Sequence, residues 1–204
     1  MSTHTPLDRL ALNQLFLDAR SVHTFTDRAV TDETLRALYD LSKMGPTAFN
    51  SQPGRYVFVR SVEAKQRLVP HMMASNQAKT LKAPVTVIVA LDTLFYEQLD
   101  AQFPALPNAK MFYVDNAALA ATTAMRNGTL QGAYLMLAAR ALGLSVGPMS
   151  GFDNDAVDKE FFPDGKWRSN FVVNMGYFDD KPGDGKPNYP RGARLAFEKV
   201  AQIL

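Results

Sequence analysis

Two short segments near the ends of the chain, 19–25 and 189–195, combine cations with groups suited to binding a phosphate. The candidate residues are Arg20, Ser21, His23, Arg191 and Arg194. Arginine forms bidentate contacts with phosphate oxygens, and a serine hydroxyl adds a neutral donor. Taken singly, each group of cations is more simply explained as solvated surface charge. Phosphate binding becomes a better explanation when the two segments are taken together with the polar loop described next.

A third segment, GPTAFNSQPGRYVF (45–58), places uncharged hydrogen-bonding side chains on one loop. Gly45 and Pro46 end the preceding helical pattern, and an apolar run typical of a strand begins at Tyr56. The polar residues between them are Thr47, Asn50, Ser51 and Gln52. Most loops between a helix and a strand are polar only because water solvates them. By itself the loop therefore does not indicate a function.

Other catalytic chemistries have little support in the sequence. The chain has 3 histidines (His4, His23 and His71) and no cysteine, so a zinc site is not expected. The sequence contains no G-x-S-x-G elbow, no Walker A motif and no G-x-G-x-x-G fingerprint. If the protein is an enzyme, we expect a cofactor to supply the chemistry and the chain to bind and orient it.

Length and composition predict one globular domain over residues 1–204. Hydrophobic residues make up 47% and charged residues 21% of the chain, and the net charge is +2. No basic tract favours nucleic acid or an acidic membrane as a partner. The apolar run 83–91 is too short to cross a bilayer, and the N-terminus resembles no secretory signal. We expect a cytoplasmic enzyme or binding protein.

Periodicity and capping residues predict alternating helices and strands. Thr31 can cap a helix that ends near Gly45, and unbroken apolarity over 85–91 predicts a strand covered on both faces. Aromatic-rich residues 92–114 are interpreted as a partly helical excursion. This alternation favours an α/β or α+β sheet covered by helices. The predicted helices are 7–20, 31–45, 62–70, 76–82, 115–142, 155–162 and 195–203, and the predicted strands are 55–60, 85–91 and 171–177.

The long helix predicted over 115–142 carries a stripe of small residues. They are Ala117, Ala121, Ala124, Gly128 and Gly132. A glycine inside a helix costs roughly 1 kcal/mol relative to alanine, so we expect close approach of another backbone to offset it. That backbone could belong to the same chain or to a second subunit, and the sequence does not separate the two.

Six segments in order along the chain resemble one known family. They are DARSVHTF, VTDETLRALY, GPTAFNSQPGRYVF, KTLKAPVTVIVA, MRNGTLQGAYLMLAARALGL and GPMSGFD. With these motifs the chain resembles the nitroreductase family of FMN-dependent oxidoreductases, from Arg20 to Arg194. It is most similar to the subgroup of malonic semialdehyde reductases, also called 3-hydroxypropanoate dehydrogenases or NADH dehydrogenase/NAD(P)H nitroreductases. The resemblance implies an α+β fold, with a mainly antiparallel central sheet flanked by helices, and an intertwined homodimer.

The resemblance also implies which residues bind FMN. The loop after Gly45 would cross to the flavin held mainly by the other subunit, and Gln52 would shape that loop. His23 stands where many relatives have a second arginine or lysine, and Gly54 and Ser150 replace an aromatic and an acidic residue. The implied cofactor residues are Arg20, Ser21, His23, Arg191 and Arg194 for the phosphate, Asn76 and Lys79 beside the ring and ribityl chain, Pro148, Ser150 and Gly151 near N5, and Pro46, Thr47 and Asn50 from the crossing loop.

The implied activity is a ping-pong oxidoreduction in which NADH or NADPH passes hydride through flavin N5 to a small electrophile. Malonic semialdehyde, giving 3-hydroxypropanoate, or a nitro or quinone compound would be the acceptor. Arg126 or Arg55 is a candidate for binding a substrate carboxylate, and aromatic residues could wall the pocket. A flavin-binding sensor or carrier without turnover, and a cofactor-free interaction protein, remain alternatives. The candidate wall residues are Phe49, Phe95, Phe112 and Tyr113.

Overall fold

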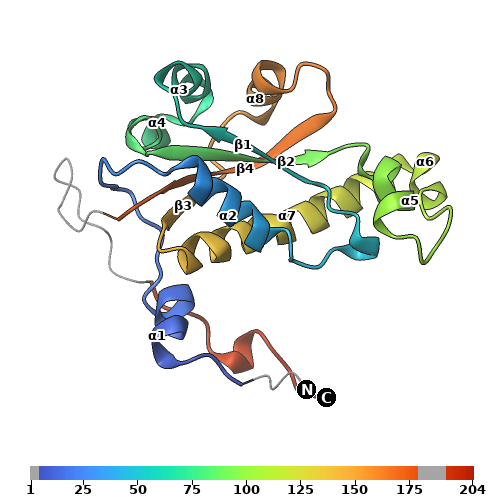
Figure 1. The fold of residues 1–204 in the computed structure, drawn as a ribbon, viewed down its shortest axis with the longest axis horizontal. Coiled ribbons are helices and arrows are strands. Elements are labelled where there is room, and N and C mark those ends of the chain that lie inside the picture. The colour runs from blue at the N-terminus through green and yellow to red at the C-terminus, as the bar shows by residue number, and fades with distance from the viewer. Residues whose placement is uncertain (1–4, 179–191) are drawn as a thin grey trace.

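One β-sheet with helices on both faces forms the body of the molecule (Figure 1). The computed structural model describes residues 5–178 and 192–204. Within those residues the strands form one sheet in the order β1-β2-β4-β3, and each neighbouring pair is antiparallel. The antiparallel sheet flanked by helices confirms the predicted α+β class. The strands are β1 (Gly54–Val59), β2 (Val85–Asp92), β3 (Ser145–Met149) and β4 (Trp167–Gly176).

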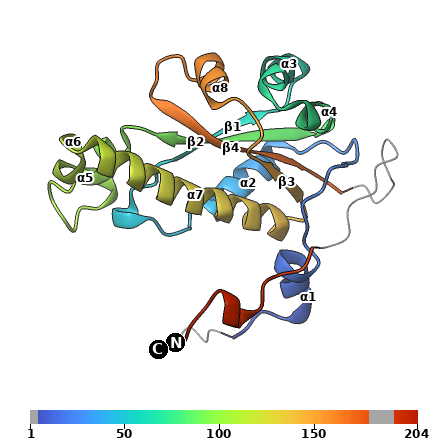
Figure 2. The same cartoon turned by 180° about the vertical axis from the view of Figure 1, so that it is seen from behind.

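Helices cover both faces of the sheet (Figures 1 and 2). Helices α2 and α7 lie on one face, and α3, α4 and α8 lie on the other. The predicted cap of α2 is present, because the Thr31 side chain accepts a hydrogen bond from the Thr34 N–H. The helices of the body are α2 (Asp32–Ser42), α3 (Val62–Leu68), α4 (Ala74–Lys82), α7 (Ala117–Ala141) and α8 (Asn154–Phe161), with short turns at η2 (Ala48–Asn50) and η3 (Val69–His71).

Strand β2 explains why both layers are needed. Val85, Val87 and Val89 pack into the cluster that includes Leu38 of α2 and Leu135 of α7. The intervening side chains of β2 point the other way, because side chains alternate along a strand. Ile88 and Ala90 accordingly join the cluster on the opposite face. The prediction that this strand is covered on both sides is confirmed.

Residues 92–114 form a helical excursion at one end of the sheet, as predicted. It contains η4 (Phe95–Gln98), α5 (Leu99–Gln102) and α6 (Met111–Val114). Phe95, Leu99 and Tyr113 are buried in a cluster of their own with Ala120 and Ala124 of α7. The excursion is therefore part of the folded body and not a linker.

The small-residue stripe of α7 is partly explained by packing within the chain. A Cβ at Gly128 would overlap the Leu91 side chain, and one at Gly132 would lie 2.5 Å from Phe171 Cζ. Helix α7 therefore approaches β2 and β4 closely at these two glycines. Ala117 and Ala121 are exposed, so none of the described residues (5–178 and 192–204) covers that end of the stripe.

Two predicted helices differ from the structure, and one strand was not predicted. The helix predicted over 7–20 is α1 (Arg9–Leu12) followed by the π-helical turn η1 (Asn13–Leu17), and the helix predicted over 195–203 is only the turn η6 (Phe197–Lys199). Strand β3 was not predicted, since its sequence SVGPM contains glycine and proline. It lies at the edge of the sheet, where proline's missing N–H is tolerated.

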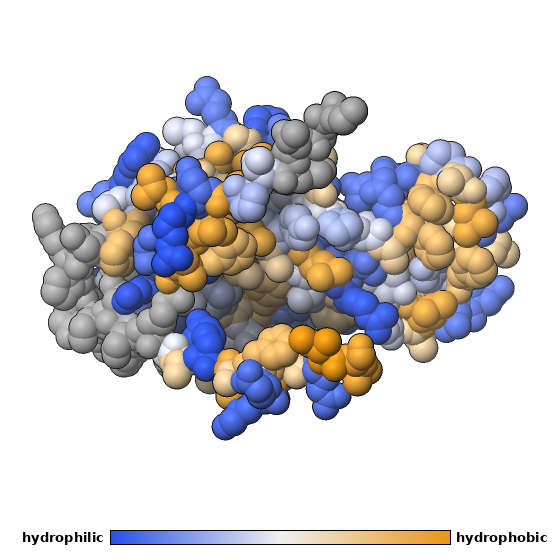
Figure 3. Space-filling model, turned by 90° about the horizontal axis from the view of Figure 1, so that it is seen from below, coloured by the Kyte–Doolittle hydropathy of each residue, from blue (hydrophilic) through white to orange (hydrophobic). Residues whose placement is uncertain are grey.

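The terminal segments, 5–19 and 192–204, extend from the same side of the body (Figure 1). They expose several large apolar side chains; Leu10 is 79% exposed and Ile203 is 89% exposed. Figure 3 shows separate apolar groups on this underside of the molecule. A folded chain that leaves so much apolar surface in water suggests a partner for this surface. No helix within the described residues is long and apolar enough to span a membrane.

Candidate functional site

The segment that carries Ser21 and His23 lies against the edge strand β3. Ser21 and Val146 form a parallel β-bridge, and the Val22 N–H donates to the Val146 carbonyl at 3.2 Å. Gly147 permits this approach, because a Cβ there would be 2.6 Å from the Val22 carbonyl oxygen. The segment thus acts as an additional partner of the sheet edge and brings Ser21 next to Val146, near the start of β3.

His23 lies near Lys79 of α4. Burial lowers the pKa of His23 below 6.5, and the positive charge of Lys79 lowers it further. Burial also lowers the pKa of Lys79. A bound anion would stabilise the charged forms of His23 and Lys79, so this part of the molecule favours an anionic ligand.

Helix α4 is joined directly to the turn after β3. The Asn76 side-chain amide donates to the Gly151 carbonyl at 2.9 Å, and the Met73 N–H donates to the same oxygen at 3.0 Å. A Cβ at residue 151 would lie 2.7 Å from Asn76 Nδ2 and from Met73 Sδ, so only glycine fits without displacement. Pro148 and Ser150 remain exposed beside this junction.

Helix α4 is also fixed at its other end. The Lys65 ammonium of α3 donates to the carbonyls of Leu81, at 3.1 Å, and Ala83. Lys65 is buried, and this burial lowers its pKa. The last carbonyls of a helix have no partner within the helix, so Lys65 satisfies them and orients α4.

Two contacts and one electrostatic interaction therefore bring residues predicted from separate motifs to one place. Ser21 pairs with β3, His23 lies near Lys79, and Asn76 bonds Gly151. We define this group as the α4–β3 site. It offers a hydroxyl, cations, an amide and exposed backbone, but no paired acid and base. Such a set can bind an anionic or polar ligand, and the chemistry must come from the ligand.

The 46–52 loop has an unusual backbone. Phe49, Asn50 and Gln52 have φ values of 52°, 50° and 42°. A non-glycine residue in this region costs of order 1–3 kcal/mol, and such strain is typical of functional segments. Gln52 shapes the loop as predicted, because its N–H donates to Thr47 Oγ1 at 3.2 Å and its side chain donates to Asn50 Oδ1 at 3.1 Å.

Three amides outside the loop hold it, and sequence analysis missed all of them. Asn127 and Gln131 of α7 accept from the N–H groups of Ala48 and Gly54, and Gln102 accepts from Gln52. The available signal was the pair of amides four residues apart on the long helix, each directly before a glycine.

Within one chain the 46–52 loop is distant from the α4–β3 site. Helix α4 lies at one end of the long axis, and the loop lies toward the other end, beside α5 (Figures 1 and 2). The structure therefore joins Asn76, Lys79 and Gly151 but does not bring Pro46, Thr47 or Asn50 to them. Crossing of this loop to a second subunit stays a prediction.

The arginines predicted to clamp a phosphate lie in different surroundings. Arg20 lines a cavity of about 230 Å³ together with Gln14, Val22 and Arg140. Arg194 is exposed, and its guanidinium donates to the Gly192 and Ala193 carbonyls at 2.9 and 3.3 Å. Arg191 lies outside the described residues. Convergence of these cations on one phosphate stays a prediction.

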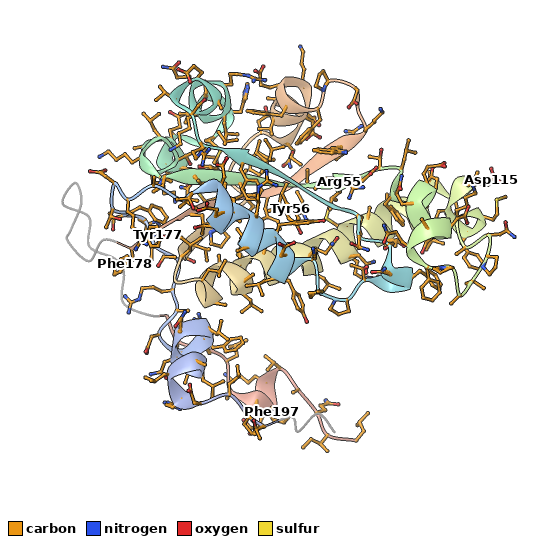
Figure 4. The ribbon with its side chains drawn as sticks, viewed as in Figure 1. Arg55, Tyr56, Asp115, Tyr177, Phe178 and Phe197 are labelled. Carbon is orange, nitrogen blue, oxygen red and sulfur yellow. The ribbon has the colours of Figure 1, made fainter. Side chains whose placement is uncertain are left out.

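Arg55 is engaged within its own chain and is a poor candidate for a substrate carboxylate. Its guanidinium bonds Asp92 at 2.5 Å and donates to the Gln52 carbonyl at 2.9 Å (Figure 4). Arg126 is exposed on α7. Phe95 and Tyr113, suggested as pocket walls, are 0% and 4% exposed and belong to the core. That suggestion is wrong for these two residues, because the excursion needs its own apolar centre.

The model described as "Nitroreductase family" matches residues 17–177, which is most of the chain. The chain belongs to the nitroreductase family. The matched region includes the α4–β3 site and the 46–52 loop.

Nitroreductase-family relatives resemble the chain over nearly its whole length. A protein of Rhodopseudomonas palustris (strain TIE-1), named "Putative NADH dehydrogenase/NAD(P)H nitroreductase", is 53% identical over 95% of each chain. A similarly named protein of Ralstonia nicotianae is 50% identical over 97% of this chain and 98% of its own. A structure from Exiguobacterium sibiricum, titled a putative nitroreductase in complex with FMN, superposes with a TM-score of 0.80 at 20% identity over 100% of both chains.

We expect Gly147→Ala to detach the segment around Ser21 from β3. The new methyl group would meet a backbone oxygen, which cannot move away as a side chain can. Overpacking of this kind costs about 1–3 kcal/mol in the free energy of unfolding. Thermal unfolding and the rate of tryptic cleavage at Arg20 measure the effect.

Gly192→Ala is the matched control, since the nearest atom to its Cβ would be 3.8 Å away. If Gly147→Ala is cleaved at Arg20 no faster than Gly192→Ala, the close packing of this segment on β3 is not what holds it in place.

Proposed function

We propose that the protein is an FMN-dependent oxidoreductase that takes hydride from NADH or NADPH and reduces a small electrophile. The observation that carries the proposal is the α4–β3 site, where a hydroxyl, a lysine, a histidine that can be protonated and an amide lie together without a paired catalytic acid and base. The FMN in the Exiguobacterium structure and the nicotinamide cofactors in the relatives' names support the same cofactors here.

The residues at the α4–β3 site fit FMN. A flavin ring has carbonyls and nitrogens that accept or donate single hydrogen bonds, and a phosphate needs cations and hydroxyls. Lys79 and Asn76 would bind the ring and ribityl chain, and Ser21, His23, Arg20 and Arg194 would bind the phosphate, with Arg191 as a further cation. Pro148, Ser150 and Gly151 would place exposed backbone against the ring.

A homodimer would complete the site. In our proposal Pro46, Thr47 and Asn50 reach the flavin of the partner subunit, because they lie far from the α4–β3 site of their own chain. The exposed apolar residues of the terminal segments supply a surface on which a second copy can pack. Thr47 Oγ1 accepts from the Gln52 N–H, so its hydroxyl proton can be donated to a flavin oxygen or nitrogen.

FMN, when bound, supplies reversible hydride transfer at N5. The chain would hold the ring with one face open, place Lys79 near its polar edge and leave room for nicotinamide and acceptor in turn. Malonic semialdehyde is the acceptor suggested by the subgroup, and a nitroarene or quinone fits the same open face. Arg126 is the exposed cation available for a carboxylate.

Anaerobic titration tests this proposal. Purified protein loaded with FMN is mixed with NADH or NADPH, and its absorbance is followed near the flavin maximum. Bleaching followed by reoxidation with malonic semialdehyde, a nitroarene or a quinone would identify the reaction and the acceptor. Flavin that stays oxidised with both nicotinamides would favour the alternative, a flavin-binding sensor or carrier. Failure to bind FMN would overturn both.

FMN affinity should increase as the pH falls from 8 toward 6.5. The lowered pKa of His23 makes it neutral at pH 7 in the free protein, whereas a bound phosphate stabilises its protonated form. Binding then takes up a proton, so the affinity rises by up to about tenfold per pH unit for one linked group. Fluorescence titrations of FMN at several pH values measure this slope.

Two substitutions of His23 separate this effect from titration elsewhere. His23→Gln should remove most of the slope, and His23→Arg should remove it while keeping high affinity at pH 8. Equal slopes for the wild type and His23→Gln would assign the pH dependence to another group.

A further inference from the structure

Buried side-chain amides of helix α7 hold the 46–52 loop near its start, at Ala48, and just after its end, at Gly54. The Ala48 N–H donates to Asn127 Oδ1 at 2.8 Å, and the Gly54 N–H donates to Gln131 Oε1 at 2.7 Å. Asn127 and Gln131 are each 4% exposed. They are four residues apart, so they share one face of the helix and act as a pair of fixed acceptors.

The glycines of α7 make these contacts possible. Gly128 follows Asn127 and packs on Leu91, and Gly132 follows Gln131 and packs on Val89 and Phe171. Without Cβ atoms at these two positions, the helix axis lies close enough to the sheet for the adjacent amides to reach the loop. The orientation of Asn127 is set as well, because its Nδ2 donates to the Thr123 carbonyl at 2.9 Å.

The centre of the loop is held from a different element. Gln102, the last residue of α5, accepts from Gln52 Nε2 through Oε1 at 2.8 Å and from Asn50 Nδ2 through its carbonyl at 3.0 Å. The loop is therefore held near its start and just after its end by α7, and in its middle by the 92–114 excursion. Phe49 also stacks on Phe112 of that excursion, with centroids 6.2 Å apart.

These contacts account for the backbone of the loop. Three of its residues have φ values in the left-handed region, which non-glycine residues leave unless surrounding bonds hold them. Neither Asn127, Gln131 nor Gln102 belongs to the proposed flavin contacts. Their bonds go to the segment that would make those contacts.

We propose that Asn127, Gln131 and Gln102 are positioning residues that hold the 46–52 loop in its flavin-binding shape before the flavin arrives. This inference rests on the proposed function, in which Pro46, Thr47 and Asn50 contact FMN. The loop then loses little conformational freedom on binding, and that preorganisation increases affinity. The small-residue pattern of α7 thereby serves the cofactor site as well as core packing.

The test compares Asn127→Ala, Gln131→Leu and Gln131→Glu with the control Leu135→Val. Leu135 is fully buried one turn beyond Gln131 and packs in the core, so its truncation perturbs α7 without touching the loop. Gln131→Glu keeps a side-chain oxygen that can accept from the Gly54 N–H. Each purified protein is titrated with FMN by fluorescence quenching, and hydrogen exchange of residues 46–54 is measured without flavin.

We expect Asn127→Ala and Gln131→Leu each to weaken FMN binding by about tenfold, as expected for a buried donor left without its partner. Both should also accelerate exchange within residues 46–54 selectively. Gln131→Glu should bind FMN with an affinity within about threefold of the wild type. Leu135→Val should bind it within about twofold, even if its melting temperature falls as far as those of the two amide variants.

Two outcomes would overturn the inference. The first is a wild type that binds FMN while Asn127→Ala and Gln131→Leu bind it equally well. The second is a loss of affinity in Leu135→Val as large as theirs, since general loosening of α7 would then explain the effect. A wild type that takes up no FMN would overturn the proposed function and the flavin role of the loop, whereas unchanged exchange in the variants would show that these amides do not hold the loop.

Discussion

The Leu10→Asp variant is expected to be a well-folded monomer that no longer retains FMN. Leu10 is 79% exposed in the single chain, so the substitution removes little packing within it. In the proposed homodimer, the same side chain would lie in an apolar interface together with residues of the C-terminal segment such as Ile203. An aspartate there would have to be desolvated without a partner.

The expected change in the dimer dissociation constant follows from the two-fold symmetry of the proposed interface. Burying one leucine side chain contributes about 1.5–3 kcal/mol, and a two-fold interface contains each residue twice. Losing both should therefore raise the dimer dissociation constant by at least about a hundredfold, because 1.4 kcal/mol corresponds to tenfold. A monomer would lack the partner's 46–52 loop and would therefore lose FMN. A substitution in the N-terminal segment would thus empty the α4–β3 site.

Sedimentation velocity and the flavin content of the purified protein measure both effects. Val62→Asp is the matched control, because Val62 is 64% exposed on α3, away from the terminal segments, and an aspartate is favourable in the first turn of a helix. Both variants should keep the wild-type far-UV circular dichroism, and only Val62→Asp should remain dimeric and yellow. A Leu10→Asp protein that remains dimeric and yellow would show that the terminal segments do not form the interface.

Replacement of Lys79 by methionine should lower the reduction potential of the bound flavin by about 30–60 mV. The reduced ring carries more negative charge than the oxidised ring, and a charge-assisted hydrogen bond contributes about 1.5–3 kcal/mol. For a two-electron couple, 30 mV corresponds to about 1.4 kcal/mol. Lys79 is half-buried, and burial already lowers its pKa, so its charge is less screened than that of a surface lysine.

Lys82→Met provides the control, since it removes the same charge from the same helix at an exposed position. Potentials are measured by equilibration with a reference dye, so the result does not depend on turnover. Lys79→Met should also bind FMN more weakly than Lys82→Met. If the two variants shift the potential equally, Lys79 acts only as a general positive charge and does not contact the ring.

Local periodicity and capping residues in the sequence were sufficient to predict most of the helices and strands. The capped helix after Thr31, the doubly covered strand at 85–91 and the long helix ending before Gly143 were all predicted, because each has a strong periodic or capping signal. Gly143 has a φ of +77°, the left-handed value expected of a glycine that ends a helix. Strand β3 was missed because its pairing comes from β4 and not from its own residues.

By itself, the sequence determined the fold class, the family and the types of side chain available to bind a cofactor. Only the tertiary structure decided which of them lie together: Ser21 at β3, His23 near Lys79, and Asn76 on Gly151. It also decided that Asn127 and Gln131 hold the 46–52 loop. The reason is that secondary structure depends on neighbours a few residues away, whereas these contacts join segments up to 125 residues apart. The contacts of Asn127 and Gln131 also depend on how closely two glycines let α7 approach the sheet.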